Sequence, residues 1–208
     1  MPELGLFPLP IVLVPTERIP LHIFEPRYRE LIDECVAAET EFGLALSTGD
    51  GAVHEVGTRA RVADVLELLD DGRMNIIVEG GDRFRLLELT TGRAFTTGIV
   101  EQLEDEDDPA DEADVEHALE VFGDLAALAD SEVDVPDPSS PTFDWELAAR
   151  VDFGVDPKQE ILAMTSPRLR MARLVEVLES SLEALQAEQL LRERAGRNGK
   201  VTPLDPEV

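Results

Sequence analysis

Cysteine is nearly absent from this chain of 208 residues. The single thiol, Cys35, excludes an internal disulfide and a cysteine-based metal cluster, and it fits a reducing compartment. No stretch reaches the roughly 18 consecutive apolar residues that a membrane helix needs, and the N-terminus lacks the basic and apolar pattern of a signal peptide. We therefore expect a cytoplasmic protein without a membrane partner.

Positive charge is also scarce. The chain has 18 lysines and arginines against 45 aspartates and glutamates, which gives a net charge of −27. Nucleic acid is not an expected partner, because phosphate binding needs a basic stripe and none is visible. The proportions of apolar and charged residues are ordinary for a soluble globular protein with a buried core. The acidity fits a proteome-wide bias or salt adaptation as readily as a specific function.

The start of the chain combines prolines with aliphatic residues. Residues 6–14 favour an edge strand or an extended segment, because Pro8 and Pro10 cannot donate to a ladder. Residues 19–24 continue extended, and Pro26 suits the first turn of a helix. The helix carries an apolar face that we expect to be buried, formed by Tyr28, Leu31, Ile32, Cys35 and Val36.

Strand patterns follow this helix in quick succession. They cover residues 41–47, 59–69, 74–79, 84–90 and 95–103. Glycines mark two expected turns, one at Gly72 after two aspartates and one at Gly80 before Gly81 and Asp82. Residues 1–103 are therefore predicted to form an antiparallel, twisted, barrel-like sheet with one early helix.

Acidic residues replace the strand pattern at residue 104. We interpret residues 104–114 as a solvated acidic linker and residues 115–195 as a helical subdomain. Within that subdomain, Ser166 followed by Pro167 predicts the start of a long last helix. Residues 196–208 are expected to form a flexible tail.

Several segments resemble one known family. They are "LFPLPIVLVPTERIPLHIFEPRYRELI" at 6–32, "FGLALS" at 42–47, "VGTRARV" at 56–62, "DDGRMNIIVEGGDRFRLLEL" at 70–89 and "DPKQEILAMTSPRLRMARLVEVL" at 156–178. In order and spacing they resemble the N-terminal substrate-binding domain of the ATP-dependent protease Lon, and most closely the stand-alone bacterial proteins that consist of that domain alone. The block "PLHIFEPRY" is the most specific part of the resemblance, which covers residues 6–190.

The resemblance implies an α+β fold, with a PUA-like β-barrel-type N-terminal subdomain and a helical C-terminal subdomain that ends in a long helix. It also implies a role in capturing substrate protein, without chemistry of its own. The sequence lacks the G-x-x-x-x-G-K-[ST] motif of an ATPase, because Gly199-Lys200 is followed by Val201 without the upstream glycine spacing. We found no serine–lysine protease pair, and therefore expect no enzymatic activity.

Candidate site residues fall into two groups. The tentative peptide contacts are Pro20, Phe24 and Trp145. The structural motif comprises Leu21, His22, Ile23, Glu25, Pro26, Arg27, Tyr28, Gly72, Gly80 and Arg83. We expect residues 19–28 to be mainly architectural, with Leu21, Ile23 and Phe24 docked into the barrel and Glu25 holding the guanidinium of Arg27.

Catalytic and metal-binding interpretations of the histidines are less favoured. His22 alternates with apolar residues in an extended run, and the nearby Cys35 lies on a helix face expected to be buried. His54 and His117 are isolated in the sequence, so no metal site and no cofactor are expected.

Two hypotheses for function are favoured over a third, an orphan hydrolase, which has the least support. The leading one is a non-catalytic module that binds unfolded or exposed apolar protein segments, some with basic flanks, in connection with a protease system. The alternative is a small-molecule sensor that uses a PUA-like pocket, with an aromatic-lined cavity near Trp145 or Phe24 as its sign.

Overall fold

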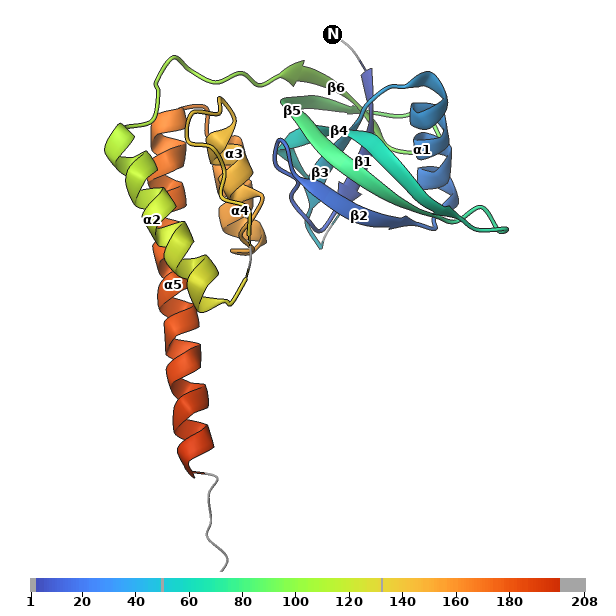
Figure 1. Cartoon of the computed structure of the whole chain (residues 1–208). Helices are drawn as coiled ribbons and strands as arrows, with labels where there is room; N and C mark the ends of the chain where they lie inside the picture. Colours follow the sequence, from blue (N-terminus) through green and yellow to red (C-terminus); the bar gives the residue numbers. More distant parts are fainter. Residues whose placement is uncertain (1–2, 50, 132, 199–208) are drawn as a thin grey trace, which may run out of the picture.

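The computed structural model describes residues 3–49, 51–131 and 133–198. A β-rich half and a helical half lie side by side, and the last helix extends well beyond the body (Figure 1). The strands are β1 (Glu3–Leu9), β2 (Arg18–Ile23), β3 (Phe42–Ser47), β4 (Val53–Leu68), β5 (Met74–Thr90) and β6 (Thr97–Gln102). The helices are α1 (Pro26–Ala38), α2 (Glu112–Leu128), α3 (Phe143–Ala148), α4 (Val155–Ala163) and α5 (Pro167–Asn198).

One mixed sheet contains all six strands, in the order β2-β5-β4-β3-β1-β6. The long strand β5 also pairs with β6, so the sheet curls back on itself as a barrel does. The expected α+β class and barrel-like form are confirmed. The expectation of a purely antiparallel sheet is wrong, because β1 and β3 run parallel.

Of the two alternatives predicted for residues 6–14, an edge strand or an extended segment, the edge strand is wrong for the first strand. It ends at Leu9 and lies between β3 and β6. Its two halves differ, however: residues 3–5 pair with β6, whereas residues 6–9 pair with β3. Pro8 lies in the half of β1 that forms a strand ladder on one side only, with β3. The other side of this half has no ladder partner among the described residues, so an internal strand can accommodate a residue without an N–H group here.

The glycines of the two expected turns have different roles. Gly72 does lie in a hairpin turn, with a φ of 80° that favours glycine, so this prediction is confirmed. Gly80 is not in a turn, because β5 continues through it. A Cβ atom at Gly80 would lie 2.2 Å from the carbonyl oxygen of Val14. The missing side chain therefore allows the loop after β1 to lie against β5, where Thr16 donates to the Gly80 carbonyl at 2.9 Å.

Helix α1 begins at Pro26, as predicted, and covers the sheet with the expected apolar face. Tyr28, Leu31, Ile32 and Cys35 are buried there. Val36 is 45% exposed, so its assignment to this face is wrong. It follows Cys35 directly, and one residue rotates the side chain by about 100° around the helix axis.

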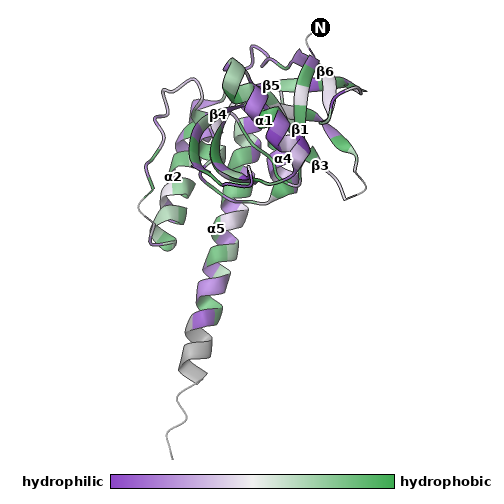
Figure 2. Cartoon of the chain, turned by 90° about the vertical axis from the view of Figure 1, so that its right-hand side faces the viewer, coloured by the Kyte–Doolittle hydropathy of each residue, from purple (hydrophilic) through white to green (hydrophobic). Residues whose placement is uncertain are grey.

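Helices α3, α4 and α5 pack against the other side of the β-rich half. Val12, Val14, Leu46 and Val56 contribute to a core cluster with Trp145, Ile161, Leu162 and Leu174. Helix α5 starts as predicted, because the Ser166 hydroxyl accepts a hydrogen bond from the backbone N–H of Leu169 at 3.1 Å. Beyond the body, hydrophilic and hydrophobic residues alternate along α5 (Figure 2). The helix runs to Asn198, and the rest of the tail predicted from Gly196 lies outside the described residues.

Candidate functional site

Strand β2 separates its residues between two faces. Ile19 and Leu21 are half-buried and Ile23 is buried, whereas Pro20 and His22 are exposed. This is the alternation that a pleated strand imposes on its side chains. The next residue, Phe24, is 59% exposed, so the prediction that it docks into the barrel is wrong, although it is correct for Ile23.

A shallow groove of about 550 Å³ lies on this exposed side of the sheet. It is lined by Pro20, Leu21, His22, Leu66, Glu67, Asn75 and Ile76. The register between β4 and β5 shifts between Val65 and Glu67, so Leu66 is an additional residue without a direct partner in β5. Leu66 is 57% exposed beside the groove. We call Pro20, Phe24, Leu66 and the groove between β2 and β4 the hairpin face.

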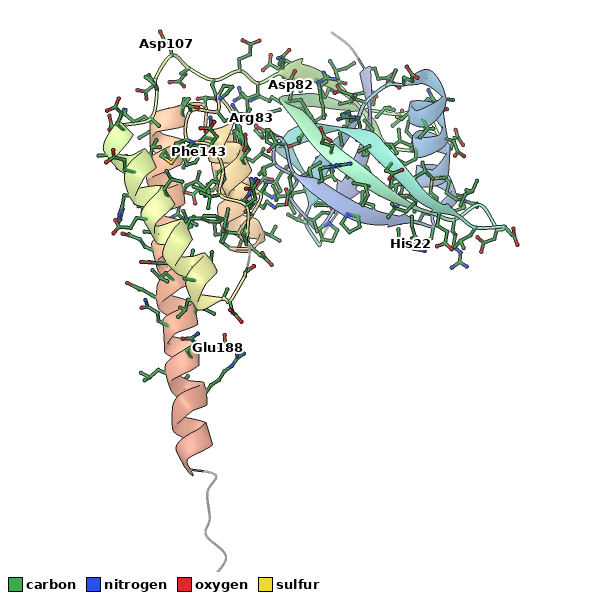
Figure 3. All side chains as sticks on the ribbon, in the orientation of Figure 1. His22, Asp82, Arg83, Asp107, Phe143 and Glu188 are labelled. Atoms are coloured by element: carbon green, nitrogen blue, oxygen red, sulfur yellow. The ribbon has the colours of Figure 1, made fainter. Side chains whose placement is uncertain are left out.

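A row of polar side chains crosses the hairpin face. The Asn75 amide nitrogen donates to Glu67 Oε2 at 2.8 Å, so its oxygen accepts from His22 Nδ1 at 2.7 Å. The His22 ring also stacks on Phe24, with ring centroids 6.0 Å apart. His22 is therefore engaged with an amide and an aromatic ring, which supports its architectural interpretation. His22 lies beside the hairpin that β4 and β5 form, as Figure 3 shows.

The rest of the "PLHIFEPRY" block anchors α1. Arg27 donates from Nε to Glu25 Oε2 at 2.9 Å, which is the contact expected from the sequence. The Arg27 guanidinium also lies 4.4 Å from the centroid of the Tyr28 ring. Tyr28 is buried with its ring 4.1 Å from that of Phe7, and burial raises the pKa of its hydroxyl. Pro26, at the start of α1, is exposed.

Trp145 does not belong to the hairpin face. It is buried at the junction of the sheet and the helices, where the guanidinium groups of Arg170 and Arg83 lie 4.0 and 5.0 Å from its ring centroid. The side chain is thus inaccessible to a peptide in this structure, and we correct its assignment from a binding contact to a junction residue. The sensor hypothesis expected an aromatic-lined cavity near Trp145 or Phe24; at Trp145, the two arginines lie against the ring instead.

Arg83 and Arg170 share an ionic cluster that we call the junction network. Asp105 Oδ2 accepts from Arg170 Nη2 at 2.6 Å, and its other oxygen accepts from both Arg170 and Arg83. Asp144 accepts from Arg170 Nε at 2.6 Å. Arg83 also donates to the carbonyls of residues 162 and 164 at 2.8 and 2.6 Å. The network joins β5, the segment after β6, α3 and α5.

The surroundings of Arg83 and Arg170 shift the pKa values of the two side chains in opposite directions. Burial lowers the pKa of Arg83, and Asp105 only partly opposes this effect. Burial also acts to lower the pKa of Arg170, but the hydrogen bonds and charges of Asp105 and Asp144 raise it overall. Among the described residues, Asp105 is the carboxylate that Arg83 contacts.

The acidic segment 104–114 is not solvated throughout. Asp105 belongs to the junction network, and Asp108 accepts from the Ser166 hydroxyl at 2.5 Å and from Arg168 Nε at 3.0 Å. These two carboxylates therefore have arginine and hydroxyl partners within the protein, while the interpretation of residues 104–114 as a linker stays a prediction. The domain division at this segment stays a prediction.

The sequence reasoning missed Arg170 and Asp144. A signal was available for Arg170, which directly precedes Met171 and stands one helical turn before Leu174, both on the apolar face of the last helix. A charged residue beside such a face suggests a buried partner. Its acidic partners come from distant segments, and the local pattern gives no indication of them.

The mixed sheet, the early helix and the long last helix define an α+β domain of the kind found at the N-terminus of Lon proteases. The chain belongs to the family "ATP-dependent protease La (LON) substrate-binding domain", whose model matches residues 3–180. This match is to the substrate-binding domain of Lon and not to its ATPase or protease modules.

Relatives and solved structures agree with this family. "Lon protease 1" of Hydrogenovibrio crunogenus is 26% identical in an alignment 202 residues long that covers 88% of this chain and 24% of that protein. "Lon protease 1" of Syntrophobacter fumaroxidans is 26% identical in an alignment 208 residues long that covers 92% of this chain and 25% of that protein. The chain thus spans about a quarter of the length of these curated relatives. The crystal structure of a Lon N-terminal domain protein from Xanthomonas campestris has a TM-score of 0.67 and 26% identity, covering 85% of this chain and 98% of that one.

Metal clusters and membrane-spanning helices are both absent from the described residues. No group of three or more histidine, cysteine, aspartate or glutamate side chains is placed to hold a metal ion in that part of the chain. None of the helices described combines the length and the apolar character needed to cross a bilayer.

Proposed function

We propose that this chain is a non-catalytic module that binds exposed apolar segments of unfolded or damaged proteins through the hairpin face. The observation that carries the proposal is the exposure of Phe24 and Leu66 beside a groove on a face otherwise built from ordered strands. Leu66 lines the groove, and Phe24 stacks on His22, which also lines it. Exposed apolar patches are a common mark of protein-binding surfaces. Membership of the Lon substrate-binding family supports the same class of ligand.

The geometry favours recognition through side chains. Strand β2 has β5 as its ladder partner, so its other edge is available, but Pro20 removes a backbone donor from this short strand. The hairpin face therefore offers a phenylalanine, a leucine and a groove rather than a full ladder for strand addition. Ordering a flexible client costs several kcal/mol, so we expect affinities in the micromolar range.

We propose that a protease system acts on the captured protein, since the family model that matches this chain is that of the Lon substrate-binding domain. We propose that no cofactor takes part in capture. The polar row of His22, Asn75 and Glu67 would orient the apolar groups around it and does not react with the client.

The double variant Phe24→Ser/Leu66→Ser tests this proposal. Binding of a labelled, permanently unfolded protein, measured by fluorescence anisotropy, should weaken at least about thirtyfold, because each of the two apolar anchors that become buried on binding contributes roughly 1 kcal/mol or more. Leu191→Ser is a matched control, because Leu191 is a 64% exposed leucine on the distant part of α5. Equal affinities for the double variant and the control would remove the hairpin face from the mechanism.

A further inference from the structure

A second groove lies in the helical half, away from the hairpin face. It has a volume of about 710 Å³ and is enclosed by residues 105–110, helix α2, residues 138–141 and the start of α5. In Figure 3, Asp107 and Phe143 mark this side of the molecule, and His22 lies on the opposite side. We call this hollow the acidic groove.

The floor of the acidic groove is apolar. Val115 and Leu119 of α2 face it, together with Phe143, Pro167 and Met171. Phe143 and Met171 are 4% and 1% exposed, so they form a fixed base, whereas Val115 and Leu119 are half-buried and accessible from the groove. A floor of this kind accepts one large apolar side chain, because burial of that side chain removes both surfaces from water.

The rim of the acidic groove carries uncompensated negative charge. Asp107, Glu112 and Glu116 line it and are exposed. Among the described residues, none of these three carboxylates forms an ion pair with an arginine, lysine or histidine of this chain. This distinguishes them from the neighbouring Asp105 and Asp108, which are paired with arginines of β5 and α5.

We propose that the acidic groove binds protein segments in which an aromatic or aliphatic side chain is flanked by lysine or arginine. The apolar side chain occupies the floor, and the flanking cations lie against Asp107, Glu112 and Glu116. The inference rests on the proposed function for its class of ligand, but it assigns the preference for basic flanks to a different surface. Charge complementarity identifies the occupant, since an acidic flank would meet three like charges at the rim.

A second copy of this chain is the competing occupant. Its residues 190–200 combine two leucines with three arginines and a lysine, so they have the required chemistry. The net charge of −27 opposes association of two copies. We therefore favour a client segment, and self-association becomes an outcome of the test.

The test uses three labelled peptides of equal length: phenylalanine flanked by lysines, phenylalanine flanked by glutamates, and serine flanked by lysines. The full chain should bind the first more tightly than the other two, as measured by anisotropy at low salt. In the triple variant Asp107→Asn/Glu112→Gln/Glu116→Gln, we expect affinity for the first peptide to fall about tenfold, because three exposed ion pairs are lost. The ratio between lysine-flanked and glutamate-flanked peptides should then approach one.

Matched controls separate this surface from the hairpin face. Glu30→Gln/Asp33→Asn/Glu183→Gln changes the net charge equally at exposed positions outside the groove and should keep the preference for lysine flanks. Phe24→Ser/Leu66→Ser should also keep that preference while it binds the unfolded protein more weakly. The single variant Glu116→Lys provides an independent charge reversal should the triple variant fold poorly.

The outcomes are distinct. If both the triple variant and Glu116→Lys still prefer lysine-flanked over glutamate-flanked peptides, the proposal for the acidic groove is overturned. The proposed function remains intact in that case if binding of the unfolded protein still depends on Phe24. Equal binding of the serine peptide and the lysine-flanked phenylalanine peptide also overturns the proposal for the acidic groove, because the attraction is then only electrostatic. Self-association of the wild type that the triple variant abolishes, seen by sedimentation, assigns the groove to a second copy instead.

Discussion

Replacement of Asp105 by asparagine removes the carboxylate that two buried arginines share. The side chains of Arg83 and Arg170 are 4% and 1% exposed, so neither guanidinium can turn to bulk water. Arg170 retains Asp144 as a carboxylate partner. Arg83 retains two carbonyl contacts and the face of Trp145. The variant therefore leaves one buried cation without an opposite charge in contact.

The expected cost follows from this geometry. Removing one partner of a buried ion pair costs about 3–5 kcal/mol. The Asp105 side chain is 33% exposed, so water reaches this side of the cluster and reduces the expected loss to about 2–3 kcal/mol. For a chain of this size, that loss lowers the melting temperature by roughly 4 to 12 °C.

Urea unfolding and calorimetry of Asp105→Asn measure this loss directly. Asp107→Asn is the matched control, because it makes the same chemical change two residues away, at an exposed rim position. The control should shift stability by no more than about 0.5 kcal/mol. If the two variants unfold alike, the carboxylate of Asp105 does not stabilise the fold through the two buried arginines.

Three further outcomes can be measured on the same protein. Gly80→Ala should lower the free energy of unfolding, measured in urea, by about 1–3 kcal/mol, because its Cβ would meet the Val14 carbonyl. Gly81→Ala, whose Cβ would have its nearest contact at 3.3 Å, should be tolerated. Equal effects of the two variants would contradict the close-approach explanation. A hydrogen bond to Glu179 raises the pKa of His117 above its ordinary value of 6.5. The stability of the wild type relative to His117→Gln should therefore be greatest below about pH 6.5 and fall as the pH rises through the folded-state pKa. A stability difference that does not change with pH would refute the linkage. The melting temperature should rise with sodium chloride, because the Debye length falls from about 10 Å at 0.1 M to about 3 Å at 1 M, and a flat curve would indicate local pairing of the acidic groups.

Local sequence signals were sufficient where local physics decides the structure. The start of α1 at Pro26 and the turn at Gly72 follow from residues that sit within the element itself. Gly80 shows the limit, because a glycine pair before an aspartate fits a turn as well as a close approach between segments. The carbonyl of Val14 decides between them, and the position of that loop is a tertiary fact.

The candidate site was predictable in part. Alternation along β2 places Ile23 inward, and the same alternation would have placed Pro20, His22 and Phe24 outward. The prediction instead gave priority to the hydrophobicity of Phe24. For Trp145, the identity of a single aromatic residue suggested a binding contact, but its environment comes from arginines 62 and 25 positions away in the sequence, which no local pattern contains.

The junction network lies between the two halves of the molecule that carry the two proposed binding surfaces. The hairpin face lies on the sheet and the acidic groove lies on the helices, at opposite sides of the body (Figure 3). A client that is bound at one surface has a raised effective concentration at the second surface. This gain in affinity requires that the sheet and the helices keep a fixed arrangement. Arg83, on β5, and Arg170, on α5, meet at Asp105 between these two halves. Buried charges give directional contacts that an apolar junction would lack, and the network therefore favours one arrangement of the two surfaces over others.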